Sequence, residues 1–566
     1  MTHAPMNPSN ATLQTPWLDG LTIGQALTHM AATFPEREAI VFAHENLRLS
    51  YREYDAKVTQ VAKGLLAMGI QPGEHIGVWA TNIPQWVLLQ YGAARAGIVL
   101  VTINPAYRPF ELSYTISQSD IVALFLTDQF KSSDYYAIFA EACPEITIAQ
   151  QGMIRAEAFP KLRLAVALKA NAPSGYLGWE EMLSAGRNTE DTTLEAIAAS
   201  LKATDVINIQ YTSGTTGFPK AAMLTHRNIL MNAYYVTGCQ NITENDRMCV
   251  PVPFYHCFGC VMGSLGAVSR GATLVIPAEY FQPAATLEAL EKERCTTIYG
   301  VPTMFVAMLD EMSKTPRKLP ALRSGIMAGS PCPIEVMKKV IDVMNCREIT
   351  IAYGQTETSP VVTQSRTDDS VALRVETVGR EIDGVEIEIR NPETGAKMPD
   401  GEQGELCARG HTTMRGYYKN PEATATTIDK DGWVHTGDLA IRRPDGNFKI
   451  TGRLKDMVIR GGENIYPREI EEFLFTHPDV AQAAVFGVPD PKYGEELCAW
   501  IQLHPNTQLD EETLRAFCKK SLAHYKVPRY IQFVESFPTT VSGKIQKFKM
   551  REHVCDALKL QEQKTA

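Results

Sequence analysis

The segment whose residue types are best suited to chemistry is rich in hydroxyl groups and ends in a lysine. It runs from Tyr211 to Lys220 and reads YTSGTTGFPK. Four Ser and Thr hydroxyls and the N–H groups of a glycine-containing turn can converge on phosphate oxygens, and Lys220 adds a positive charge. The common nucleotide loop places lysine directly after its second glycine, whereas Lys220 comes three residues after Gly217. The segment predicts a phosphate-binding loop of another kind, with a surface turn as the alternative.

Four charged side chains further along the chain have the chemistry that a nucleotide site requires. Glu357 stands between two threonines and can hold Mg²⁺ against triphosphate oxygens; a carboxylate at a helix start is the alternative. Asp438 can accept two hydrogen bonds from ribose hydroxyls, or can be a turn aspartate. Arg453 offers a planar fork to ribose or phosphate oxygens. Lys544 follows a glycine near the end of the chain, where a solvated lysine is the alternative.

Short apolar runs alternate with longer amphipathic runs over the first four-fifths of the chain. The run Val206–Tyr211 predicts the strand that leads into the hydroxyl-rich segment. The next run predicts a helix over Thr225–Val236, with Thr225 as its N-cap. The alternation continues as far as a predicted strand at Glu348–Ala352. Such alternation predicts an α/β fold, in which parallel-type sheets are covered by helices.

The pattern changes after about Thr377, where short β-like runs such as Gly379–Arg390 are separated by Gly, Pro, Asn and Asp turns. These runs predict a small β subdomain. Helix and strand patterns mix again from Lys455 onward. We therefore predict a large N-terminal domain of two helix-covered sheets plus the β subdomain over residues 1–454, and a small α+β C-terminal domain over residues 455–566.

The motifs occur in an order that resembles one family. Thr212–Lys220 resembles the phosphate loop of the adenylate-forming (AMP-binding) enzymes, which include acyl-CoA synthetases, luciferases and peptide-synthetase adenylation domains. Further segments match the family in its own order between about residues 49 and 544: Tyr353–Thr358, Thr436–Asp438, Gly452–Asp456, Gly461–Pro467 and Pro538–Lys544. Within that superfamily, the chain is most similar to the medium-chain acyl-CoA synthetases of the family member 2 type.

The resemblance implies a ligase that works in two half-reactions. A fatty acid, expected to be of medium chain length, attacks the α-phosphorus of ATP to give acyl-adenylate and pyrophosphate. Coenzyme A then attacks the acyl-adenylate to give acyl-CoA and AMP. Lys544 serves only the first half-reaction, so the small C-terminal domain is expected to be mobile. Two alternatives stay open: an adenylating enzyme that loads the phosphopantetheine of a separate carrier protein, and a non-catalytic nucleotide-binding protein.

The resemblance also assigns residues to ATP, Mg²⁺ and coenzyme A. It implies catalytic roles for Lys544, Glu357, Thr212 and Lys220, with Glu357 as the Mg²⁺ ligand. The implied ATP and AMP contacts are Thr212, Ser213, Gly214, Thr215, Thr216, Gly217, Phe218, Pro219, Lys220, Gly329, Ser330, Pro331, Tyr353, Gly354, Gln355, Thr356, Asp438, Arg453 and Lys544. Lys455 matches the hinge. Gly461 and Gly462 match the coenzyme A tunnel, with a plain turn as the alternative.

The acid pocket implied by the resemblance is aromatic, apolar and small in its residue types, which suits an apolar acyl chain. Its residues are Tyr255, His256, Phe258, Tyr299, Val301 and Gly354. Amino-acid-activating relatives place an aspartate where Tyr255 stands, so amino acids are not expected as substrates. Acetate-specific relatives place a bulky tryptophan where Gly354 stands, so a longer acid is expected. His256 is expected at the substrate carboxylate or as a gate, with a packed wall residue as the alternative.

Composition limits the other classes of function. The chain has 566 residues and a net charge of −9, which argues against a nucleic-acid partner. Its apolar stretches are shorter than a membrane span, and its start lacks the features of a signal peptide. Twelve scattered cysteines suit a reduced cytoplasm, and Cys257 and Cys260 are expected in the core rather than on a metal. We expect a cytoplasmic monomer or homodimer.

Overall fold

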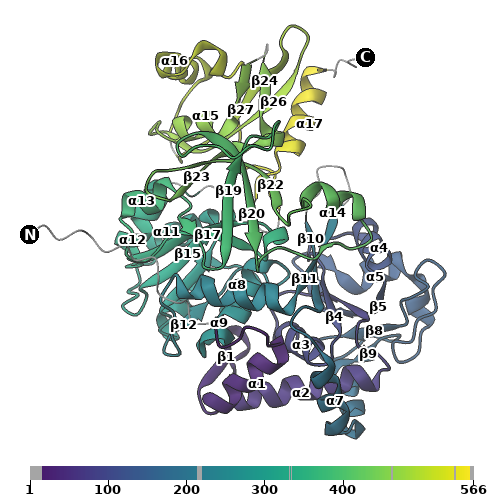
Figure 1. Ribbon diagram of the computed structural model, residues 1–566. Coiled ribbons are helices and arrows are strands. Elements are labelled where there is room, and N and C mark those ends of the chain that lie inside the picture. Colours follow the sequence, from purple (N-terminus) through teal and green to yellow (C-terminus); the bar gives the residue numbers. More distant parts are fainter. Residues whose placement is uncertain are drawn as a thin grey trace, which may run out of the picture.

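The computed structural model describes residues 16–212, 219–330, 332, 334–460, 463–505, 507–540 and 544–560. Figure 1 shows a large body and a smaller lobe above it that contains α15, α16 and α17. The body contains two large sheets and a four-stranded antiparallel sheet. The prediction of an α/β fold with parallel sheets, a small β subdomain and a small C-terminal α+β unit is confirmed.

The first large sheet has nine strands in the order β18-β17-β16-β15-β14-β12-β13-β1-β2. The pairs that join β16, β15, β14, β12, β13 and β1 are all parallel. These strands are β1 Glu38–Phe42, β12 Arg247–Cys249, β13 Thr273–Ile276, β14 Thr297–Gly300, β15 Ser324–Ala328 and β16 Glu348–Gly354. Because the strands are parallel, their carboxyl ends share one edge, where ligands bind in sheets of this kind.

The second large sheet has eight strands in the order β21-β11-β10-β4-β3-β5-β8-β9. Besides β10 and β11, these strands are β3 His75–Trp79, β4 Val99–Thr102, β5 Ile121–Leu126, β8 Leu164–Ala167, β9 Leu177–Gly178 and β21 Gly416–Tyr417. Its strands β10 (Val206–Thr212) and β11 (Lys220–Thr225) are antiparallel, with Thr212 opposite Lys220. The sequence did not predict β11, because Lys220 was interpreted as the last residue of a loop. In the structure Thr212 and Lys220, on either side of the predicted phosphate segment, lie side by side on β10 and β11.

The helices begin and end close to the predicted positions. Thr225 caps α8 (His226–Gly238) as expected, since its hydroxyl accepts a hydrogen bond from the Asn228 N–H at 3.1 Å. Helix α3 (Pro84–Arg95) is buried on nearly all sides, which fits a sequence that is apolar or uncharged up to its last residue, Arg95. A π-helix at Phe258–Leu265 was not predicted. Among the described residues, no helix is long and apolar enough to cross a membrane.

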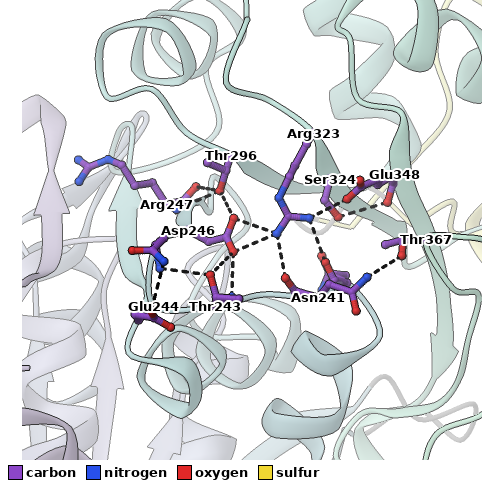
Figure 2. Close-up of polar contacts among 12 residues, drawn as sticks. Asn241, Thr243, Glu244, Asp246, Arg247, Thr296, Arg323, Ser324, Glu348 and Thr367 are labelled. Atoms are coloured by element: carbon purple, nitrogen blue, oxygen red, sulfur yellow. Dashed lines mark hydrogen bonds and ion pairs between the residues drawn. The ribbon is translucent and has the colours of Figure 1, made fainter. Parts of the chain in front are cut away.

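A polar network joins the amino ends of four parallel strands, on the edge opposite the ligand edge (Figure 2). The Arg323 guanidinium lies 2.9 Å from the Asp246 carboxylate and 2.7 Å from that of Glu348. Thr296 donates a hydrogen bond to Asp246 at 2.6 Å. These residues precede or begin β12, β14, β15 and β16. The network fixes the strands at one edge and leaves their carboxyl ends available for chemistry.

The four-stranded antiparallel sheet has the order β19-β20-β22-β23. Its strands are β19 Val385–Arg390, β20 Gln403–Gly410, β22 Val434–Arg442 and β23 Phe448–Arg453. The predicted run Gly379–Arg390 was wrong as a single element, because β18 (Arg380–Glu381) pairs with the nine-stranded sheet instead. A tight turn at Gly384, with φ of +75°, separates the two pieces.

The chain changes sheets immediately after β23. A short 3₁₀ turn at Leu454–Asp456 contains Lys455 and leads into a separate five-stranded sheet. That sheet holds β24 Val458–Arg460, β25 Glu463–Ile465, β26 Val480–Asp490, β27 Gly494–Leu503 and β28 Tyr530–Phe533, with α15 Pro467–Leu474, α16 Glu511–Ser521 and α17 Lys547–Leu558 packed around it. A boundary at residue 455 is compatible with this change and stays a prediction.

Candidate active site

Several predicted site residues gather at the carboxyl ends of the nine-stranded sheet. Val301 follows β14, Gly329 and Ser330 follow β15, and Tyr353 and Gly354 end β16. Gly329 has φ of +91°, and a Cβ built on it would lie 3.2 Å from a Val301 methyl group. The residues assigned to the adenine and to the acyl chain are therefore direct neighbours on adjacent strands.

Gly354 is required by close packing of the chain on itself. A Cβ added to this residue would lie 1.8 Å from the carbonyl oxygen of Pro360. Any side chain here would force the backbone of β16 away from the segment that follows it. Backbone packing therefore explains why glycine occupies position 354, whatever the length of the acid. That Gly354 makes room for a longer acid stays a prediction.

Glu357 is buried and held by a residue that the sequence did not reveal. The Tyr417 hydroxyl donates to a Glu357 carboxylate oxygen at 2.7 Å, and the Lys220 ammonium lies 4.8 Å from the centre of the Tyr417 ring. Burial and the Glu357 charge raise the pKa of Tyr417 well above its ordinary value, so its hydroxyl stays a donor. Tyr417 belongs to β21 and has no motif signal, because only the pairing of β21 with β11 brings it here.

Asp438 and Arg453 form the centre of a polar cluster. They are register partners on β22 and β23, and the Arg453 guanidinium donates to Asp438 at 2.8 Å. The second Asp438 oxygen accepts hydrogen bonds from the Tyr353 hydroxyl at 2.6 Å and the Gln355 amide at 3.0 Å. Burial, followed by the Asp438 charge, raises the pKa of Tyr353. Three predicted motifs therefore meet at one nearly buried carboxylate.

Lys544 reaches this cluster from the C-terminal lobe. It sits on a turn in which its carbonyl accepts from the Thr540 N–H at 2.8 Å. The Lys544 residue as a whole is exposed to solvent, whereas its ammonium group is surrounded by protein atoms. Desolvation and then Arg453 lower the Lys544 pKa, while the charges of Asp438 and Glu357 raise it. Burial is the largest of these effects, so the pKa of Lys544 is lowered. Residues that lie far apart in the sequence thus share one electrostatic environment.

His256 lies in the same environment and is neutral. Burial and then the charge of Lys544 lower the pKa of His256 to about 3. Its Nδ1 accepts a hydrogen bond from the Phe258 N–H at 3.2 Å, which leaves the proton on Nε2. The structure therefore places His256 beside Lys544, and its expected role at the substrate carboxylate or as a gate stays a prediction.

The other acyl-pocket candidates lie between β14 and the unpredicted π-helix. Tyr299 is fully buried, and its ring centre is 5.8 Å from that of Phe258. Cys257 donates to the Gln210 amide oxygen at 3.0 Å, and the Gln210 amide donates to Cys260 at 3.1 Å. Burial raises the pKa of Cys260 to about 12. The two cysteines are core residues, as expected, and no sequence pattern indicated Gln210.

Some predicted contacts fall outside the described residues. These are Ser213, Gly214, Thr215, Thr216, Gly217, Phe218, Pro331, Gly461 and Gly462. Their assignments to phosphate, adenine and coenzyme A therefore stay predictions. The flanking residues Thr212, Pro219, Ser330 and Lys455 are described, and each lies next to an element of the site.

Comparison with known proteins places the chain in a family. The AMP-binding enzyme model matches residues 27–418, and the model of the AMP-binding enzyme C-terminal domain matches residues 469–544. The Bacillus subtilis (strain 168) protein named "Putative acyl-CoA synthetase YngI" is 48% identical over 95% of this chain and 98% of its own length. The Bos taurus protein named "Medium-chain acyl-CoA ligase ACSF2, mitochondrial" is 42% identical over 96% of this chain and 89% of its own length.

A solved structure extends the likeness to three dimensions. ATP-bound MatB from Rhodopseudomonas palustris superposes with a TM-score of 0.78 and 27% identity, covering 95% of this chain and all of that one. The predictions of an adenylate-forming fold and of an AMP-forming acid–thiol ligase are confirmed at the level of the family. The predicted cytoplasmic location stays a prediction, since the Bos taurus relative is named as mitochondrial. With both lobes matched by its models, the chain belongs to the AMP-binding enzyme family.

Proposed function

We propose that this protein converts a medium-chain fatty acid to its coenzyme A thioester through an acyl-adenylate, with release of AMP and pyrophosphate. The observation that carries the proposal is the convergence of Lys544 with Glu357, Asp438 and Arg453, groups that come from different lobes. Transfer of the adenylyl group from ATP to the acid needs no protein nucleophile. It needs fixed positions and compensation of charge, which this cluster supplies.

The charges suit the adenylation half-reaction. Asp438 would accept hydrogen bonds from the ribose hydroxyls, since a carboxylate has about four acceptor positions and three protein donors use only part of them. Lys544 would compensate the negative charge that develops as the carboxylate attacks the α-phosphorus. The Glu357 carboxylate, in a pocket with Lys220 and Tyr417, fits Mg²⁺, whose oxygen ligands include triphosphate oxygens and which would neutralise the departing pyrophosphate.

The acid specificity is supported by the pocket and by the relatives. Phe258, Tyr299 and Val301 are buried apolar side chains beside Gly329. Such a lining removes water from an aliphatic chain, which stabilises its binding by about 0.8 kcal/mol per buried CH₂. An ionised amino group would meet no carboxylate at Tyr255. The name of the Bos taurus relative supports medium chain length.

The thioester half-reaction requires a second arrangement of the lobes. On this proposal the arrangement with Lys544 near Asp438 and Glu357 serves adenylation, so the C-terminal lobe would turn about Lys455 before coenzyme A enters. Loading of a separate carrier protein is the competing function, because a carrier phosphopantetheine presents the same thiol.

A panel of acids tests both the acid and the acceptor. Purified protein would receive ATP, Mg²⁺ and butyrate, octanoate or palmitate, with coenzyme A or a phosphopantetheinylated carrier protein as the acceptor. We expect octanoate with coenzyme A to give the highest kcat/KM for AMP release, together with octanoyl-CoA. A preference for palmitate or butyrate would contradict medium chain length. Pyrophosphate release with thioester only on the carrier would contradict the coenzyme A ligase.

A further inference from the structure

A second polar cluster lies in the four-stranded sheet, next to the turn that precedes Asp438, the carboxylate proposed to bind the ribose. It contains Glu405 and Cys407 of β20, His435 of β22, and Asp429, which precedes β22. Cys407 and His435 are register partners, and Glu405 is two residues before Cys407 on the same face of the strand. The side chain of Glu405 is almost fully buried. None of these residues belongs to a predicted motif contact.

Glu405 is hydrogen-bonded to the turn that precedes Asp438. One carboxylate oxygen accepts from the Gly437 N–H at 2.9 Å, and the other accepts from His435 Nδ1 at 2.8 Å. Gly437 has φ of +69°, a left-handed conformation that a hydrogen bond to its N–H holds in place. Since Asp438 is the next residue, the direction of its carboxylate depends on this turn.

The far end of the cluster is anchored to another strand. His435 Nε2 lies 3.6 Å from the Asp429 carboxylate. Asp429 in turn accepts from the Arg390 guanidinium at 3.1 Å and from the Trp433 N–H at 2.9 Å. The chain of contacts from Arg390 to Gly437 therefore ties the turn to the sheet, so Glu405 cannot shift without breaking several bonds.

The distances describe a hydrogen-bonded network rather than a metal site. Two ligand atoms on one Zn²⁺ at about 2.0–2.2 Å would lie about 3.3 Å apart in tetrahedral geometry. Glu405 and His435 are 2.8 Å apart, which is hydrogen-bond distance. Burial, then the Glu405 charge, raises the pKa of Cys407 to about 12, which keeps the thiol protonated. The cluster is thus suited to holding a conformation.

We propose that Glu405 is a positioning residue for ribose recognition, acting through the Gly437 turn on Asp438. It rests on the proposed function, in which Asp438 binds the ribose hydroxyls. The consequence is specific: the preference of the enzyme for ATP over 2′-deoxy-ATP depends on Glu405, although Glu405 does not touch the nucleotide.

The test compares kcat/KM for ATP and 2′-deoxy-ATP in Glu405→Leu, Glu405→Gln and the control Glu386→Gln. Glu386 is an exposed glutamate of β19 whose partner is Arg409. We expect Glu405→Leu to lower the ATP preference by about tenfold, the size of one well-aligned hydrogen bond. Glu405→Gln should keep most of it, since its amide can accept from Gly437 and donate to His435. Glu386→Gln should match the wild type.

Two results would overturn the proposal in distinguishable ways. Equal losses with both nucleotides in Glu405→Leu would leave the ratio unchanged and show a purely structural role. No preference for ATP in the wild type would remove the ribose role of Asp438 and with it the basis of the proposal. If Glu405→Leu does not fold, His435→Leu serves instead. It removes only one anchor of Glu405, and an unchanged ratio there would also count against the proposal.

Discussion

At the scale of residues, the site balances two cations against two carboxylates. Arg453 and Lys544 face Asp438 and Glu357, and the direct Arg453–Asp438 pair lies within 2.8 Å. The surroundings of Lys544 disfavour its charge and lower its pKa, because desolvation and Arg453 both act against the ammonium. A phosphate placed beside it would remove that disadvantage. An anion beside the Lys544 ammonium would therefore stabilise its charged form.

Replacing Lys544 should separate the two half-reactions. We expect Lys544→Ala to slow adenylation by about 10²-fold or more, because it removes the charge that meets the α-phosphate. Conversion of supplied acyl-adenylate to thioester should be unchanged. Pyrophosphate exchange measures the first reaction and thioester formation the second. Lys549→Ala, on an exposed position of α17, is the control. Equal losses in both reactions would refute the division of labour.

The same residue predicts a pH dependence. Because the pKa of Lys544 is lowered, its charge is lost as pH rises, and at lower pH than for an ordinary lysine. Adenylation should therefore fall on the alkaline side while thioester formation from supplied acyl-adenylate does not fall in parallel. Lys544→Arg keeps its charge there, so its alkaline limb should be flatter. An identical alkaline limb in both proteins would argue against Lys544 as the titrating group.

At the scale of elements, the nine-stranded sheet assigns different tasks to its two edges. The amino ends of β12, β14, β15 and β16 are joined by the polar network of Figure 2. The carboxyl ends carry several of the predicted site residues, among them Val301, Gly329 and Tyr353. The contacts that stabilise the sheet therefore lie at the amino ends of the strands, and the predicted site residues lie at their carboxyl ends.

This separation predicts a variant that loses stability but keeps activity. Arg323→Met leaves the nearly buried Asp246 without its ion partner, which should lower the free energy of unfolding by about 2–3 kcal/mol. Urea denaturation measures the loss. Lys314→Met is the control, because Lys314 and its partner Asp310 are both largely exposed and such pairs contribute about 0–1 kcal/mol. At temperatures where the protein stays folded, KM for ATP should not change; a large increase would show that the two edges are coupled.

At the scale of the whole molecule, we propose that the position of the small lobe decides which half-reaction can occur. In this structure α15 packs against β23, and the Lys449 ammonium lies 3.6 Å from the Glu472 carboxylate across that contact. The contact accompanies the placement of Lys544 in the site. On the proposed role of Lys544, we expect this contact to belong to the adenylation arrangement.

Charge reversal at this contact should shift the balance between arrangements. In Glu472→Lys, repulsion from Lys449 should slow adenylation by about threefold, an effect of the size of surface pairs, and added salt should reduce it. Thioester formation from supplied acyl-adenylate should not slow. The double variant Lys449→Glu with Glu472→Lys restores opposite charges and should recover the rate. Failure of the double variant to recover, at low salt, would contradict the role of this contact.

The sequence by itself determined the α/β class, most of the alternation of strands and helices and the motif residues, but it missed β11 and the π-helix. Local rules explain this success. Thr225 caps the helix that begins at the next residue, and the spacing of apolar residues along the chain indicates which faces are buried. The site residues that lie within motifs, such as Asp438 and Arg453, could be proposed from chemistry and family order together.

Only the tertiary structure decided which of these residues meet. Tyr417 and Gln210 have no local signal, and Glu405 acts on Asp438 from a different strand. Their partners follow from sheet register, which depends on contacts between residues far apart in the chain. Lys544 is the extreme case, since the packing of one lobe on the other brings it to Asp438. Local periodicity determines elements, whereas long-range packing determines neighbours, and the chemistry of this site depends on neighbours.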